Sequence, residues 1–397
     1  MSLLRVLLRS LVIGYWSLVI SSLLPAAEYQ ASPDTLQRLA ERARQTQSSA
    51  VVVLKHGQPL LEWYASERPE KIEAMSVTKS VVFLAIARLI TDGRISGFDA
   101  PVYEFYPEWK QGRKASITLR HLMNHTSGLQ NVPDTTGEIY PAPDFVKLAL
   151  AAELTSDPGA VFSYNNKAVN LLAGIVQIAS GQRLDLYLKD QVFAPLGITD
   201  FSWSLDKAGN PHAMSGLQIL PRDLAKLGQL MLARGTWDGR ALIKPELIAE
   251  ATSAAQSLNP VYGLLWWLKR DKVRIVFDSE SLARFRKLEL PPDFSVRAEK
   301  LIGTYESAES LTNAFRSAFS ESDRDQIRKK TPSLDGLVRI EASITVTRYE
   351  ANGYLGQYLV VCPDTNIVAV RMIKASSARK DGSTEFTDFG DLVGALR

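Results

Sequence analysis

The chain has 397 residues, of which 46% are apolar and 22% charged, an ordinary globular composition that is long enough for a large core and two or three domains. Two of the three formal positive charges fall in the first 27 residues, so the remainder carries +1 and gives no electrostatic case for binding nucleic acid. The single cysteine, Cys362, excludes an internal disulfide, and the four histidines lack the spacing of metal ligands.

The first 27 residues are typical of a targeting segment. Arg5 and Arg9 precede an uncharged, mainly apolar run over residues 11–24, and Pro25-Ala26-Ala27 follows it. A run of this length is typical of a secretory signal and is short for a membrane span. We therefore expect a periplasmic or secreted protein. An uncleaved membrane anchor is the alternative, because the cleavage site is imperfect.

Residues 28–75 predict a helix followed by a β-hairpin. The helix covers residues 35–44. Two β-rich runs, 50–54 and 59–64, flank the turn sequence Lys55-His56-Gly57-Gln58.

A candidate nucleophile stands at Ser76, where Ser76-Val77-Thr78-Lys79 opens a long apolar run. On a helix, residues three apart share a face, so Lys79 points its amine at the Ser76 hydroxyl. A buried lysine loses its proton more readily and then acts as the base that activates the serine. The pattern predicts a covalent serine hydrolase.

The motif Ser-x-x-Lys is short, and the chain contains it three times. The copies at Ser204 and Ser377 run into turn sequences, whereas Ser76 precedes a helix that is apolar enough to be buried. For Ser76 alone, a helix cap beside a solvated lysine is an equally simple interpretation.

Residues 94–250 show helical periodicity interrupted by turns. Within them, Tyr164-Asn165-Asn166 follows a turn and is the only Tyr-x-Asn in the chain. A lysine ammonium nearby favours the phenolate of Tyr164, which can then take the serine proton or pass it to a leaving group. Asn166 can hydrogen-bond both the lysine and a substrate carbonyl. A buried tyrosine and a loop asparagine without chemistry is the alternative. The helices expected here cover residues 119–124, 142–154, 168–179 and 223–233.

Two tryptophans, Trp266 and Trp267, precede a charged stretch at 269–335. Adjacent strand residues face opposite ways, so at most one lines a pocket, and we assign Trp267 to substrate contact. The stretch 269–335 predicts a helical insertion without sheet signals. It is either a surface excursion or a lid over the active site.

Strand signals return near the C-terminus, at 342–349, 355–362 and 367–373, and a last helix covers 385–396. Strands at both ends with helices between them predict an α+β fold, with one antiparallel sheet flanked by helices and an inserted all-helical domain. The expected units are a sheet domain at 28–75 and 250–397, and the catalytic helix with the helical domain at 76–249.

Together, the motifs at Ser76 and Tyr164 resemble the first two motifs of class C β-lactamase-like serine hydrolases. That family includes penicillin-binding DD-peptidases, esterases and 6-aminohexanoate-dimer hydrolases. The resemblance covers roughly residues 35–268 and 340–395 in the family's motif order, and it implies a β-lactamase/transpeptidase-like fold. Further similar stretches lie at 122–129, 215–217, 221–228 and 262–267.

The third family motif departs from the pattern. Family members place Lys-Thr-Gly, or a variant with histidine, on the sheet edge that faces the serine, whereas Tyr354-Leu355-Gly356 fills that position here. The resemblance implies that the backbone N–H groups of Gln357 and Ser76 form the oxyanion hole, with Gly356 admitting the substrate. In β-lactamases the third-motif lysine helps to hold an anionic substrate, so its replacement favours esters or uncharged amides.

These features predict a hydrolase that cleaves a small ester, amide or peptide through an acyl-enzyme on Ser76. Lys79 and Tyr164 share the proton transfers as a coupled pair. Such chemistry needs no metal or cofactor. Two alternatives stay open: a DD-carboxypeptidase or β-lactamase, and a penicillin-binding-like sensor that has lost turnover. His125 is expected in a helix-end hydrogen-bond network.

Overall fold

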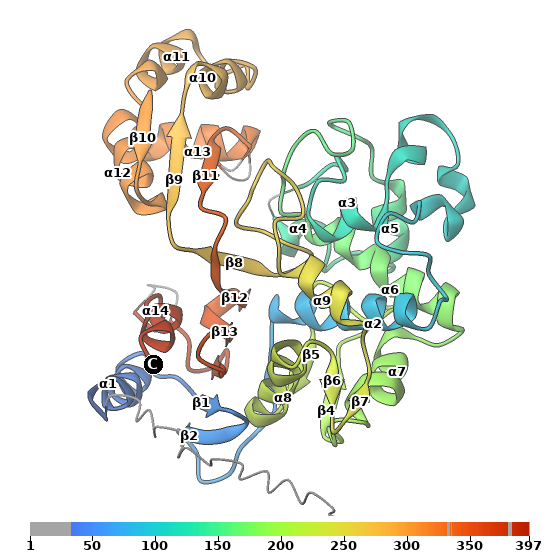
Figure 1. The fold of residues 1–397 in the computed structure, drawn as a ribbon. Helices are drawn as coiled ribbons and strands as arrows, with labels where there is room; N and C mark the ends of the chain where they lie inside the picture. The colour runs from blue at the N-terminus through green and yellow to red at the C-terminus, as the bar shows by residue number, and fades with distance from the viewer. Residues whose placement is uncertain (1–32, 133, 332–333, 335, 380–382, 397) are drawn as a thin grey trace, which may run out of the picture.

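The structure is a computed structural model that places one antiparallel sheet between two groups of helices (Figure 1). The expected targeting segment lies outside the residues that it describes. Those residues are 33–132, 134–331, 334, 336–379 and 383–396. Among them, no helix has the length and apolar character needed to cross a bilayer.

The main sheet joins both ends of the chain, which confirms the predicted architecture. Each strand pairs with its neighbours in antiparallel fashion. In spatial order the strands are β2 (Gln58–Tyr64), β1 (Ala50–Lys55), β14 (Ile367–Met372), β13 (Gln357–Cys362), β12 (Val346–Gly353) and β8 (Trp267–Arg270).

Strand β1 explains why the sheet is covered on both faces. Its sequence is almost wholly apolar, and side chains alternate between faces along a strand. Val52 and Leu54 therefore join the large core on one side, while Val51 and Val53 join a smaller core on the other. Helices α1 (Pro33–Gln45) and α14 (Phe389–Gly394) cover the smaller core, as Figure 1 shows at the lower left.

Helix α2 (Val77–Thr91) lies on the other face of the sheet and packs against β12, β13 and α6. It is apolar around its whole circumference, which is typical of a helix buried on all sides. All but two of its 15 residues are buried. Its N-terminus is therefore held rigidly between the sheet and the remaining helices.

The region 76–249 is mainly helical, but it is not all-helical as expected. Its α-helices are α3 (Leu119–Met123), α4 (Thr135–Glu138), α5 (Phe145–Ala151), α6 (Asn166–Ser180), α7 (Leu184–Leu188), α8 (Pro221–Leu232) and α9 (Pro245–Ala251). Short strands accompany them: β4 (Phe201–Trp203) and β5 (Leu217–Ile219) pair with β3 (Ile72–Glu73), and β6 (Thr236–Trp237) pairs with β7 (Arg240–Ala241).

The insertion between β8 and β12 also corrects the prediction, because it contains a sheet. Strand β9 (Val273–Phe277) is apolar apart from Arg274 and pairs with β10 (Gly303–Tyr305) and β11 (Arg339–Ala342). The unit has its own aromatic core and stands apart at the top of Figure 1. Its helices are α10 (Ser279–Arg286), α11 (Pro292–Glu299), α12 (Ala308–Ala318) and α13 (Glu321–Lys330).

Candidate active site

Ser76 occupies the turn that leads from β3 into α2. The preceding residue, Met75, adopts a left-handed backbone with φ 48°, which is unusual for a residue with a side chain. Such strain is typical of positions where the fold must present a functional group. Ser76 is the N-cap residue of α2, yet its hydroxyl makes no capping hydrogen bond and stays available for chemistry.

Lys79 lies one turn along α2 and points at Ser76, as the spacing predicts. Its Nζ donates to Ser76 Oγ and to the Met214 carbonyl, both at 2.8 Å. The side chain is 1% exposed, and this burial lowers the pKa of Lys79 to about 7. The amine is therefore uncharged in a large fraction of molecules near neutral pH, and it then offers a lone pair to the hydroxyl.

Tyr164 reaches the same place from the loop before α6. Lys79 Nζ lies 5.0 Å from the centroid of its ring. Burial raises the pKa of Tyr164 to about 12, although a hydrogen bond with Ser76 acts in the opposite direction. The expectation that the lysine favours the phenolate is therefore wrong, because desolvation dominates and keeps the phenol protonated at neutral pH.

A buried aromatic cluster supports the back of Tyr164. The His125 ring lies 4.3 Å from the Tyr164 ring, and its Nδ1 accepts from the Asn165 backbone N–H at 3.1 Å. The neutral ring therefore carries its hydrogen on Nε2, which donates to Tyr262 Oη at 3.1 Å. Burial lowers the pKa of His125 well below its usual value, so the ring is uncharged. The predicted network for His125 is confirmed.

The two asparagines of the second motif have different positions. Asn165 caps α6, where its side chain accepts from the Ala168 N–H and donates to the Leu129 carbonyl. Asn166 lines the cavity at Ser76 and donates to Thr135 Oγ1 at 2.9 Å. Within the described chain Asn166 makes no hydrogen bond to Lys79, so that part of the expectation is wrong. Its contact with substrate stays a prediction.

The third motif forms a tight turn rather than the start of a strand. Tyr354–Gly356 adopt a 3-10 turn in which Leu355 and Gly356 have positive φ, and β13 begins only at Gln357. Tyr354 is 70% exposed and lines the cavity with Ser76. Gly356 and Gln357 are absent from the described lining, and the Gln357 side chain is bonded to the Ile373 backbone. The roles of Gln357 in the oxyanion hole and of Gly356 in admitting the substrate stay predictions.

Sequence reasoning missed the close approach of Gly353 to the nucleophile turn. A Cβ on Gly353 would lie 2.7 Å from the Ala74 carbonyl oxygen and 3.1 Å from Met75 Cβ. Only glycine permits this distance, because a real Cβ atom would displace the turn. The Asn352-Gly353 pair before the third motif was the sequence feature that could have indicated this close approach.

The two tryptophans separate as the alternation predicts. Trp266 is buried in the main core, where its ring meets Tyr349. Trp267 stacks on Tyr164 with centroids 6.1 Å apart and meets Tyr262 edge-on. It is not among the residues described as lining the cavity, and its assignment to substrate contact stays a prediction.

A cavity of about 520 Å³ opens beside Ser76, within the usual range for a small-molecule site. No described residue of the insertion 269–335 lines it, which gives the lid interpretation no support. The described chain also contains no group of three or more His, Cys, Asp or Glu side chains placed to hold a metal. The lining residues are Glu73, Met75, Ser76, Asp134, Thr135, Thr136, Tyr140, Asn166, Met214, Ser215 and Tyr354.

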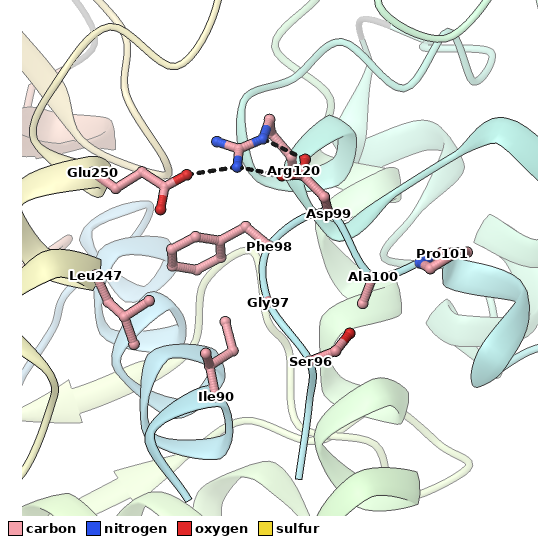
Figure 2. A pocket seen from close by; sticks show the side chains of 10 residues that line it. All are labelled: Ile90, Ser96, Gly97, Phe98, Asp99, Ala100, Pro101, Arg120, Leu247 and Glu250. Atoms are coloured by element: carbon pink, nitrogen blue, oxygen red, sulfur yellow. Dashed lines mark hydrogen bonds and ion pairs between the residues drawn. The ribbon is translucent and has the colours of Figure 1, made fainter. Parts of the chain in front are cut away.

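A second cavity, of about 410 Å³, lies near the opposite end of α2 (Figure 2). Its charged groups already satisfy one another. Arg120 makes two hydrogen bonds to Asp99, at 2.6 and 2.8 Å, and one to Glu250 at 2.5 Å. The arrangement joins the loop before α3 to α9 and is structural.

Comparisons with known proteins give one family match and several relatives. Residues 34–387 match the family model described as Beta-lactamase. The esterase EstB of Burkholderia gladioli is 30% identical over 206 residues, which cover 45% of this chain and 52% of that protein. A candidate penicillin-binding protein of Bacillus subtilis, PbpX, is 32% identical over 144 residues, 36% of each chain. The chain thus spans about half or less of these curated relatives.

Solved structures share the fold at low sequence identity. A candidate 6-aminohexanoate-dimer hydrolase from Bacillus anthracis superposes with a TM-score of 0.62 at 16% identity. The match covers 89% of this chain and 80% of that one.

Proposed function

The chain belongs to the Beta-lactamase family, and on that premise we propose that it is a serine hydrolase that cleaves an ester or amide through an acyl-enzyme on Ser76. One observation carries the proposal. The Lys79 amine lies 2.8 Å from the Ser76 hydroxyl, and its pKa is lowered to about 7. A nucleophile within hydrogen-bond reach of an activated base is the signature of covalent catalysis.

In the acylation step, Ser76 Oγ attacks the substrate carbonyl while the neutral amine of Lys79 takes the hydroxyl proton. The tetrahedral oxyanion forms near the N-terminus of α2, where the helix dipole favours negative charge. The phenol of Tyr164 then gives its proton to the departing oxygen or nitrogen. The Lys79 ammonium returns a proton to the phenolate, which leaves an ester on Ser76 and restores both partners.

Deacylation repeats these transfers with water as the nucleophile. Lys79 takes a proton from water through Tyr164 or directly, and the ester bond to Ser76 breaks as its Oγ is reprotonated. The cycle uses only groups of the protein, so this mechanism requires no metal or cofactor.

Replacement of Ser76 tests the proposal. We expect Ser76→Ala to lower hydrolysis of p-nitrophenyl butyrate by on the order of 10⁴-fold or more and to abolish labelling by a fluorophosphonate probe. Ser377→Ala is the matched control, because Ser377 begins another Ser-x-x-Lys and does not line the cavity. Equal turnover by Ser76→Ala and the control, with an unchanged circular dichroism spectrum, would refute the assignment.

A DD-peptidase or β-lactamase activity is the second candidate, favoured by the similarity to PbpX over 36% of that chain. Two observations weigh against it: Tyr354 replaces the third-motif cation, and carboxylates line the cavity. A fluorescent penicillin that labels Ser76 would support this activity. A panel of short-chain esters, amide oligomers and nitrocefin distinguishes the substrate classes. A protein that has lost turnover would fail to label with a fluorophosphonate.

We also propose that the protein is exported. The support is the sequence pattern alone, in which Arg5 and Arg9 precede the apolar run at 11–24. N-terminal sequencing of the protein from a fractionated bacterial host tests this. A mature chain beginning near residue 28 in the periplasm or medium is expected. Membrane-bound protein with an intact N-terminus would support the anchor instead.

A further inference from the structure

The cavity beside Ser76 has an acidic lining. Two carboxylates, Glu73 and Asp134, line it, and no described lining residue is a lysine or arginine. Lys79 does not offset them in the form that is active in the proposed mechanism, because its amine is then uncharged. An anionic substrate would therefore meet uncompensated repulsion there, and a cation would be attracted.

Strand pairing fixes the backbone position of Glu73. Glu73 lies in β3, three residues before Ser76, and pairs in register with Gln218 of β5. Burial raises the pKa of its carboxyl, and a hydrogen bond from the Gly216 backbone acts in the opposite direction. Because Glu73 and Ser76 line the same cavity, the Glu73 charge acts on substrate groups near the scissile bond.

Asp134 supplies the second carboxylate at the N-terminus of α4. Its Oδ1 accepts from the Gly137 N–H at 2.9 Å. This capping bond orients the side chain, and Thr135 and Thr136, which follow it, also line the cavity.

Two tyrosines complete the arrangement. Tyr140 is 46% exposed and Tyr354 is 70% exposed, and both line the cavity. Exposed aromatic rings beside carboxylates form the surroundings that bind ammonium groups, since the ring face attracts a cation. Tyr354 fills the third-motif position that holds a lysine in β-lactamases. The replacement therefore exchanges a positive charge for an aromatic ring that attracts cations.

We propose that this site selects substrates that carry a cationic ammonium group close to the scissile ester or amide, and disfavours those with a carboxylate. The inference rests on the proposed function, because it names the substrate class of the same site. Glu73 and Asp134 supply the charge, and Tyr140 and Tyr354 supply the aromatic contacts.

An isosteric substrate series tests this charge preference. Acetylthiocholine, neutral 3,3-dimethylbutyl thioacetate and anionic 3-(acetylthio)propanoate are compared by thiol release. We expect kcat/KM for the cation to exceed that for the neutral isostere by about tenfold or more at low salt, and the anion to be poorest. The cation-to-neutral ratio should fall as sodium chloride is raised. A ratio near one at low salt overturns the inference while neutral hydrolysis still supports the proposed function.

Charge-removal variants localise the effect. Glu73→Gln and Asp134→Asn should each lower the cation-to-neutral ratio several-fold. Glu309→Gln, an exposed acid in the insertion, should leave it unchanged. Unaltered ratios in both cavity variants overturn the assignment to these residues.

If none of the thioesters is turned over, protection of Ser76 gives the same answer. Choline should slow fluorophosphonate labelling at lower concentration than 3,3-dimethylbutanol does, and equal protection overturns the inference. Absence of any labelling instead refutes the proposed function.

Discussion

At the residue scale, burial determines the proton distribution in the site. Desolvation is the largest influence on the pKa of both Lys79 and Tyr164. It lowers the pKa of the amine to about 7 and raises that of the phenol to about 12. Both effects favour the uncharged pair, which the proposed mechanism uses with the amine as the base and the phenol as the proton donor.

The pH dependence of catalysis tests this division of roles. Because the base form of Lys79 appears above its pKa of about 7, kcat/KM should rise through a one-proton step near pH 7. Tyr164→Phe should lower kcat/KM by about 10²- to 10⁴-fold and keep that step. Tyr305→Phe, in the insertion, is the control. A step that disappears in Tyr164→Phe would identify tyrosine as the base.

The same pKa shift predicts how stability varies with pH. Lys79 is neutral in the folded protein above about pH 7 but protonated in the unfolded chain up to its usual pKa of 10.5. In this window the unfolded state binds more protons, so the free energy of unfolding rises with pH. Lys79→Met should remove this rise.

Urea denaturation at pH 7 and pH 9 measures the effect. Stability of the wild type relative to Lys79→Met should be greater at pH 9 than at pH 7. Lys147→Met, which alters a side chain that is 83% exposed, should show no such difference. A wild-type advantage that is equal at both pH values would contradict a depressed lysine pKa.

At the scale of elements, the β12–β13 hairpin positions the cavity wall against the nucleophile turn. The turn 354–356 is bound by Arg371 of β14, a fully buried side chain. Its guanidinium donates to the carbonyls of Leu355 and Gly356, and also to Ser48, Thr46 and Thr384. One side chain thus joins the turn, the sheet and two loops.

Replacement of Arg371 should therefore affect both stability and activity. Lysine has three donors on one atom and cannot reproduce the five bonds of the planar guanidinium. We expect Arg371→Lys to lower the free energy of unfolding by roughly 2–4 kcal/mol, since buried carbonyls lose their partners. Hydrolysis should also fall as Tyr354 loses its position. Arg274→Lys, at an exposed site on β9, is the control, and similar denaturation midpoints would contradict this role.

At the scale of the whole molecule, the insertion approaches the catalytic unit where Gly336 lies near Val161 and Phe162, but the two units do not share a core. The insertion has its own core, and its described residues do not line the cavity. Lys272 and Ser343 meet at its base, where the Ser343 N–H donates to the Lys272 carbonyl at 2.9 Å. The same hydrogen bond joins the two residues that flank the turn of a two-residue β-hairpin.

The insertion should therefore be removable. Residues 273–342 replaced by Asn-Gly would connect Lys272 to Ser343 through a type I′ turn, the preferred connection for a two-residue hairpin. We expect the shortened protein to fold and to hydrolyse p-nitrophenyl butyrate with kcat/KM within about threefold of the full chain, because short surface connections are tolerated. A folded but inactive product would show that the insertion contributes to the site.

Local patterns in the sequence account for most of the fold and for the contact between Ser76 and Lys79. The β-rich runs at 50–54 and 59–64 match β1 and β2, because alternating or continuous apolar residues specify strands without distant information. Ser76 and Lys79 meet because helix geometry places residues three apart on one face. The motif order also indicated the family.

Contacts between distant segments set the remaining features. The pKa values of Lys79 and Tyr164 depend on burial by segments far along the chain. The acidic, aromatic cavity forms only when Glu73, Asp134 and Tyr354 converge from three elements. Strand β9 was obscured because its five residues lie within a charged stretch, and the segment becomes a strand by pairing with β10 and β11. Desolvation and pairing are properties of the assembled structure, and no local window of residues contains them.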